Sequence, residues 1–209
     1  MHTIIQQSVE QCQKHAKSIY LSICLITCSI IIGYAIQTYQ QSHHNAIADT
    51  FFELNRPNSA PDTEALEAYA EKHQGSIFSD LSRLKLAATY FNDDKNSMRA
   101  ASTLEKIINS SSLEHMRSLA AYRLANMIKH EDPKKSLSLT EKIKTKSLRH
   151  LRALLRSELY RNQKDHAKAM LEINSLLSDI GMDNEPDNKL LIELATQEKR
   201  QLLNEQQQT

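Results

Sequence analysis

Past residue 45 the chain alternates between segments with an apolar stripe and brief polar turns. Within each segment the apolar residues recur every three or four positions, which is the period of an amphipathic helix. Asp132 before Pro133 is a typical helix start, and Gly75 and Gly181 are predicted helix stops. The expected helices are Ala46–Asn55, Asp62–His73, Ile77–Asn92, Ser97–Asn109, Leu113–His130, Pro133–Thr145, Ser147–Asn162, Asp165–Ile180 and Pro186–Gln206.

One earlier stretch has a different pattern, because residues 19–36 are uncharged and almost continuously apolar. A helix needs about 17–25 such residues to cross a bilayer, so this run predicts an uncleaved transmembrane anchor. Lys14 and Lys17 precede the run and the next basic residue after it is Arg56, which predicts a cytoplasmic N-terminus and a translocated C-terminal part. A cleaved signal peptide and a lipoprotein signal at Cys28 are the alternatives.

The predicted organisation therefore has four parts. These are a cytoplasmic N-terminus at 1–18, the anchor at 19–36, a linker at 37–45 and one helical domain at 46–209. Composition supports an all-α class, because the chain has only 3 Gly, 4 Pro, no Trp and a single valine, Val9. Strands need β-branched and aromatic residues and turn glycines, which are scarce here.

The net charge and the positions of the cysteines limit the kinds of function that the sequence supports. The formal net charge is +1 at pH 7, so the chain lacks the basic excess of a nucleic-acid-binding protein. The three cysteines lie at or before the anchor, so the exported domain needs no disulfide in an oxidising compartment. Cys24 and Cys28 share one helix face; they either bind metal, link two anchors, or are ordinary helix surface.

Three stretches of the helical part repeat a scheme of small, aromatic or bulky, small and bulky positions. A tetratricopeptide hairpin of about 34 residues packs its two helices through such positions. The residues are Ala87, Tyr90, Ala100 and Leu104 in 77–109; Ala125, Ile128 and Ser136 in 113–146; and Ser157, Tyr160, Ala169 and Ile173 in 147–180. The turns differ in length between the stretches, so a generic helical bundle remains the alternative.

Local motifs then suggest a family. They are Glu67-Ala-Tyr-Ala-Glu-Lys-His73, the segment Ser79–Tyr90, and Leu155-Arg-Ser-Glu-Leu-Tyr160 with Lys164-Asp165 after it. With these motifs behind one anchor, the chain resembles the ancillary subunit of the bacterial SecYEG translocon, a bitopic inner-membrane protein with a tetratricopeptide-like periplasmic domain. The resemblance covers nearly the whole chain. Ser157 and Lys164 stand where the family pattern has glycine.

The resemblance implies a location in the bacterial inner membrane with the C-terminal domain in the periplasm. It also implies two partners, the SecYEG translocon and a membrane-anchored parvulin-like chaperone, with unfolded secreted chains as a further candidate. We therefore expect a non-enzymatic adaptor or co-chaperone that helps to transfer secreted proteins to periplasmic chaperones. The alternative is an envelope scaffold for outer-membrane assembly or cell division that does not bind SecYEG.

The sequence carries no catalytic signature such as HExxH, GxSxG or a P-loop, so we expect no enzyme and no cofactor. His43 and His44 are adjacent, with no acidic cluster or cysteine nearby to complete a metal site, and they fit a juxtamembrane linker better. A membrane-bound enzyme using this pair is the least favoured hypothesis.

A protein-binding groove is the remaining candidate site. In a tetratricopeptide superhelix the first helix of each hairpin lines the concave face, which suits an extended peptide or a partner helix. The alternative is that the early positions of these helices are ordinary core. The predicted groove residues are Phe91, Asn92, Tyr122, Asn126, Lys129, Glu158, Arg161 and Asn162. The last helix is expected either to cap the array or to dock a partner.

Overall fold

The computed structural model describes residues 38, 41–42, 45–56, 62–92, 95–182 and 189–206. The predicted anchor at 19–36, the three cysteines and the pair His43 and His44 lie outside these residues. Among the residues described, none of the helices has the length and apolar character needed to cross a membrane. The chain divides into two compact units, Met1–Glu53 and Leu54–Thr209.

All regular secondary structure in the described part is helical, which confirms the all-α class. Residues 45–54 form a helix, close to the predicted Ala46–Asn55. The following elements are α2 (Thr63–Lys72), α3 (Ile77–Asn92), α4 (Ser97–Ser110), α5 (Glu114–Ile128), α6 (Pro133–Thr140), the 3₁₀ turn η1 (Lys146–Leu148), α7 (Arg149–Asn162), α8 (His166–Met182) and α9 (Lys189–Gln206).

Side-chain caps explain where several helices begin. The carboxylates of Asp62 and Asp132 accept hydrogen bonds from the backbone N–H groups of Ala65 and Lys135, at 3.0 and 2.9 Å. The amide oxygen of Asn96 does the same for α4. Each bond satisfies one of the N–H groups that the first turn of a helix leaves without an intrahelical partner.

The predicted ends of α6 and α8 were wrong. The chain leaves α6 at Thr140 rather than at Thr145, because the N–H groups of Lys144 and Thr145 bond instead to the hydroxyl oxygen of Ser118 on α5, at 3.1 and 3.3 Å. Gly181 does not stop α8, which continues to Met182. A glycine weakens a helix interior but does not by itself end it.

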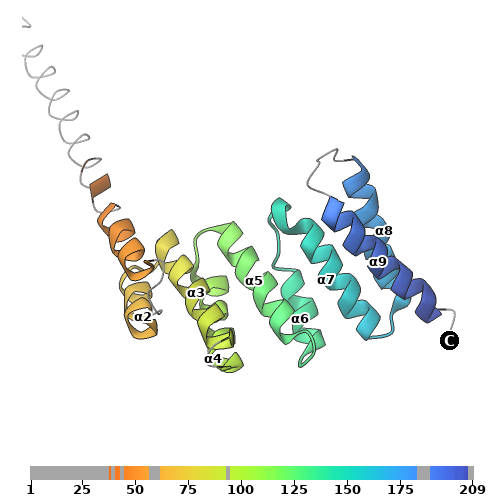
Figure 1. The fold of residues 1–209 in the computed structure, drawn as a ribbon, viewed down its shortest axis with the longest axis horizontal. Coiled ribbons are helices and arrows are strands. Elements are labelled where there is room, and N and C mark those ends of the chain that lie inside the picture. The colour runs from red at the N-terminus through yellow and green to blue at the C-terminus, as the bar shows by residue number, and fades with distance from the viewer. Residues whose placement is uncertain are drawn as a thin grey trace, which may run out of the picture. The chain divides into compact units, whose positions relative to one another are not determined.

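Within the second unit the helices form a row of antiparallel hairpins, α3 with α4, α5 with α6 and α7 with α8, and α9 packs against α8 (Figure 1). In Figure 1, α3, α5, α7 and α9 lie on one side of the row and α4, α6 and α8 behind them. Two hydrophobic clusters meet at α7. Leu155 and Leu159 join the cluster of α3 to α6, whereas Ala153, Leu154 and Tyr160 pack against the cluster of α8 and α9.

The predicted repeat positions form the contacts between paired helices. Nearly all are buried, and the exception, Tyr160, is partly buried. Small residues allow the two backbones of a hairpin to approach, and the larger ones fill the space beside them. Ser157 fits sterically, but its hydroxyl is buried without a hydrogen-bond partner among the described residues.

A buried polar cluster ties α2 to α3 and to the turn after α4. The Ser79 hydroxyl and the Arg83 guanidinium both donate to the carbonyl of Ala70, at 2.6 and 3.3 Å. The Ser111 hydroxyl donates to Asp80 Oδ2 at 2.5 Å, and Asp80 Oδ1 lies 3.8 Å from Arg83 Nη1. Buried charges persist only where such partners replace water, so the cluster fixes α2 and the turn after α4 against α3.

Candidate functional site: a groove along α3, α5, α7 and α9

One hollow opens between α3 and α5, and we call it the α3–α5 hollow. Its volume is about 480 Å³. The Phe91 side chain at its edge is 47% exposed, which is high for a large aromatic residue. Its lining consists of Leu84, Ala87, Ala88, Phe91 and Asn92 from α3, Leu104 from α4, and Tyr122, Arg123, Asn126, Met127 and His130 from α5 and its end.

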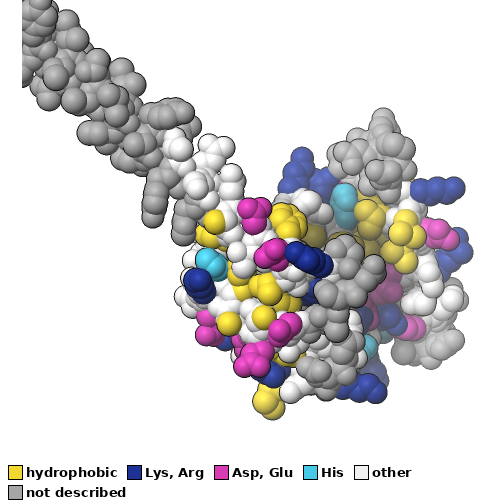
Figure 2. All heavy atoms as spheres, turned by 60° about the vertical axis from the view of Figure 1, so that its left-hand side comes forward, with side chains coloured by type: hydrophobic (Ala, Val, Ile, Leu, Met, Phe, Trp, Pro, Cys, Tyr) yellow, Lys and Arg dark blue, Asp and Glu magenta, His cyan; other side chains and the backbone are white. Residues whose placement is uncertain are grey.

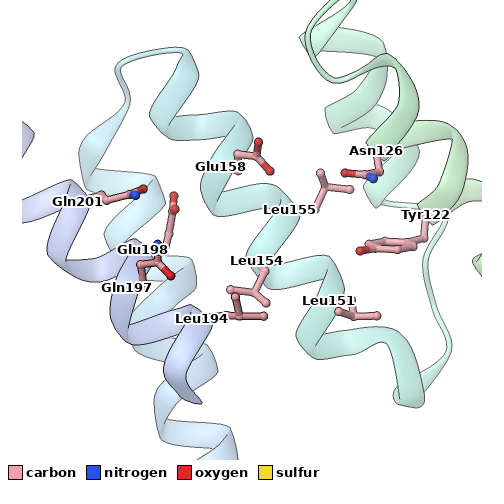
Figure 3. A pocket seen from close by; sticks show the side chains of 10 residues that line it. All are labelled: Tyr122, Asn126, Leu151, Leu154, Leu155, Glu158, Leu194, Gln197, Glu198 and Gln201. Atoms are coloured by element: carbon pink, nitrogen blue, oxygen red, sulfur yellow. The ribbon is translucent and has the colours of Figure 1, made fainter. Parts of the chain in front are cut away.

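A second hollow, the α7–α9 hollow, has a volume of about 310 Å³. Figure 3 shows it between α5 on one side and α9 on the other, with α7 between them. Tyr122 and Asn126 line both hollows, so together they form one groove across the stacked hairpins. The remaining lining is Leu151, Leu154, Leu155 and Glu158 from α7, and Leu194, Gln197, Glu198 and Gln201 from α9.

The carboxylates of the α7–α9 hollow are already neutralised by ion pairs between helices. Glu158 holds the Lys129 ammonium with both oxygens, at 2.7 and 2.9 Å. Glu198 pairs with Arg161 at 2.9 Å, and Glu205 pairs with the same guanidinium at 3.2 Å. Partial burial opposes the charge on Arg161, but these hydrogen bonds outweigh it and raise its pKa, so the residue stays cationic.

The structure brings most of the predicted groove residues to these hollows. Phe91, Asn92, Tyr122, Asn126 and Glu158 line them. The other three residues lie elsewhere: Lys129 pairs with Glu158, Arg161 pairs with Glu198 and Glu205, and Asn162 is exposed at the end of α7, outside both hollows.

The early positions of α3 and α7 belong both to the core and to the groove, which were the two alternatives that the sequence left open. Leu84 is buried, with 5% of its surface exposed, and yet contributes to the floor of the α3–α5 hollow. Leu151 and Leu154 are only partly buried and form the floor of the α7–α9 hollow. Side chains at the outer edge of the hydrophobic core therefore form the floor of the groove.

Sequence reasoning missed the contribution of α9. Its residues Leu194, Gln197, Glu198 and Gln201 form one wall of the α7–α9 hollow. The order of the helices could have predicted this role. The first and second helices of the hairpins alternate along the chain, so the helix after α8 occupies the place that α3, α5 and α7 hold in their hairpins (Figure 1). Arg123 was also missed, since it lies beside the register positions used for the prediction.

The groove offers an apolar floor with amide groups around it, and both are suited to binding rather than to catalysis. Amide side chains donate and accept hydrogen bonds, as a peptide backbone does, and leucine floors accept apolar side chains. Across the described residues, His, Cys, Asp and Glu nowhere gather in threes that could hold a metal ion. On the face shown in Figure 2, positive and negative side chains are interspersed, so that face has no field of one sign.

Comparison with known proteins identifies a family. No curated protein and no solved structure matches the chain. The sequence model of the family described as "Tetratricopeptide repeat-like domain" matches residues 12–194, which include both the apolar segment 19–36 and the stacked hairpins up to the first part of α9. The chain therefore belongs to the tetratricopeptide repeat-like domain family.

Proposed function

We propose that this protein is a membrane-anchored, non-enzymatic adaptor or co-chaperone at the Sec translocon, which assists the transfer of secreted proteins to periplasmic chaperones. The family assignment supports the coarser part of this proposal, since a tetratricopeptide-like repeat domain indicates a role in protein–protein interaction and is typically a non-enzymatic scaffold. The proposed partners are the translocon and a parvulin-like chaperone, and the proposed location is the inner membrane.

The open groove along α3, α5, α7 and α9 is the observation that carries the proposal. It is long enough to cross several helices, and its amide and leucine lining suits a polypeptide segment. The predicted anchor at 19–36 would confine this groove beside the membrane. Confinement raises the effective concentration of a partner, so even a weak binder would be occupied there.

In vivo photo-crosslinking tests the proposal. A photo-reactive amino acid replaces Tyr122, which lines both hollows, and the captured proteins are identified by mass spectrometry. The matched control places the same amino acid at Met98 of α4, which is 82% exposed and lines neither hollow. We expect translocon subunits, a parvulin-like chaperone or nascent secreted chains from position 122 and not from position 98. Capture of only cell-division or outer-membrane assembly proteins would favour the envelope scaffold instead.

The proposed topology has its own test. A membrane-impermeant maleimide should reach Cys12 only after the inner membrane is permeabilised. A cysteine introduced at the exposed Ser138 should react once the outer membrane alone is open. The reverse order of labelling would contradict the proposed orientation.

A further inference from the structure

The two hollows of the groove differ in charge. Arg123 and His130 stand at the α3–α5 hollow, and none of the side chains that line this hollow is a carboxylate. Within the described residues Arg123 is exposed and forms no ion pair. The floor beside it is apolar, made by residues such as Leu84, Ala87 and Met127.

The α7–α9 hollow differs, because its charged side chains are carboxylates that already have partners. Glu158 and Glu198 line it, and their charges are balanced by Lys129 and Arg161. An added negative charge would find no Lys, Arg or His among the described residues that line this hollow, whereas an uncharged segment would meet leucines and the amides of Asn126, Gln197 and Gln201. Among the residues described, the groove therefore has an unpaired cation at one hollow and only paired charges at the other. This difference would fix the direction in which a charged peptide segment binds.

From this asymmetry we infer the chemistry of the occupant: an extended segment of another polypeptide that places a large apolar side chain in the α3–α5 hollow, an adjacent Asp or Glu carboxylate on Arg123, and uncharged residues in the α7–α9 hollow. The Arg123 guanidinium would donate to the carboxylate, and the His130 imidazole adds a further N–H donor. This inference rests on the proposed function and names the class of segment that its groove selects.

A side-chain carboxylate fits this groove better than the carboxyl terminus of a chain. The segment enters the α3–α5 hollow and can continue past Tyr122 and Asn126, which line both hollows. The second hollow accepts the continuing chain through hydrogen bonds between its amide side chains and the peptide backbone. A segment occupying both hollows has no need to end beside Arg123.

Peptide binding to the full-length protein in lipid nanodiscs tests the inference. The probe is a fluorescein-labelled peptide with both termini blocked, Ser-Gly-Leu-Phe-Glu-Ser-Leu-Gln-Ser-Gly, and binding is followed by fluorescence anisotropy. Two further peptides carry glutamine or lysine in place of the glutamate. Because an exposed charge pair contributes little, we expect the glutamate peptide to bind about two- to fivefold more tightly than the glutamine peptide. The lysine peptide should bind the most weakly.

Three variants locate the interaction. Arg123→Gln should remove the preference for glutamate, so that the glutamate and glutamine peptides bind with equal affinity. Ala88→Leu, at an exposed position of α3, should fill the α3–α5 hollow and weaken all three peptides by about tenfold or more, since each loses a buried apolar side chain. Lys142→Gln, an exposed charge outside both hollows, is the matched control and should change nothing.

Equal affinity for the glutamate and glutamine peptides, a preference that survives Arg123→Gln, or no binding of any peptide would overturn the inference. These results are distinguishable from failure of the proposed function. If the translocon role is wrong, the crosslinker at position 122 captures no translocon component, whatever the peptides do. If only the inferred chemistry is wrong, those crosslinks persist while the peptide preference is absent.

Discussion

The hydroxyl of Ser136 on α6 donates a hydrogen bond of 2.7 Å to the backbone carbonyl of Ala125 on α5. Both residues are fully buried, and they occupy the two small positions of the second hairpin. The bond shows that the two helix backbones approach closely at this point. A serine side chain here spans the gap between the helices, and a larger side chain has no room.

We expect two substitutions of Ser136 to differ strongly in effect. Ser136→Ala removes one hydrogen bond and should lower the free energy of unfolding by about 0.5–1.5 kcal/mol. Ser136→Leu forces two additional heavy atoms between α5 and α6 and should cost about 1–3 kcal/mol or more through overpacking. Urea unfolding of the full chain in detergent micelles, followed by helical circular dichroism, measures both. Equal stabilities for the two variants would contradict close packing at this contact.

Lys164, between α7 and α8, has a φ of +61°, in the left-handed region that favours glycine. A left-handed backbone conformation costs a non-glycine residue about 1–2 kcal/mol. Glycine avoids this cost but loses about 0.5–1 kcal/mol more in chain entropy on folding. Lys164→Gly should therefore stabilise the protein by about 0.5–1 kcal/mol, measured by the same urea unfolding. Gln163→Gly is the control, because its φ of −85° suits any residue and glycine there should not stabilise. A gain in the control and none at position 164 would reject this explanation.

The neighbours Leu202 and Leu203 on α9 form a matched pair, since the first is fully buried and the second is 45% exposed. Leu202→Ala should cost about 2–5 kcal/mol in the packing of α9 on α8, while Leu203→Ala should cost little. In a stacked array each element contacts mainly its neighbours, so the loss should stay local. Hydrogen exchange should accelerate in α9 of the Leu202 variant and remain slow in α3 to α5. Uniform acceleration along the chain would show instead that the array unfolds as one unit.

Asp165 caps α8 and gives a dependence of stability on pH. Hydrogen bonds from the Lys168 ammonium at 2.7 Å and from the Lys168 backbone N–H at 3.2 Å lower the pKa of this carboxyl from its ordinary value of 3.8. A lowered folded-state pKa means that the stabilisation is present above the ordinary value and is lost as the pH falls through the lowered pKa. Asp165→Ser keeps a capping oxygen but has no titrating group. Its melting temperature should lie below that of the wild type at pH 7, and the difference should shrink towards pH 2; a constant difference would contradict the assignment.

Much of the fold follows from local sequence patterns. The bounds of α3 agree with the periodic segment Ile77–Asn92, and the caps at Asp62 and Asp132 begin their helices as the sequence predicts. Small residues such as Ala100 and Ala169 mark the contacts between helices, because only small side chains allow close approach. These features depend on residues near one another in the chain, so they can be predicted from the sequence without a structure.

Tertiary structure decided what depends on residues distant in sequence. The end of α6 is set by Ser118. Its hydroxyl accepts hydrogen bonds from backbone N–H groups that lie 26 and 27 residues further along the chain. The same holds for the groove. Helical register puts Tyr122 and Asn126 on the face that both hollows share, but only the packed array shows that α9 supplies a wall and that Lys129 is paired with Glu158. Register states which face of a helix a side chain occupies, whereas its partners depend on how the helices stack, which is a property of the whole array.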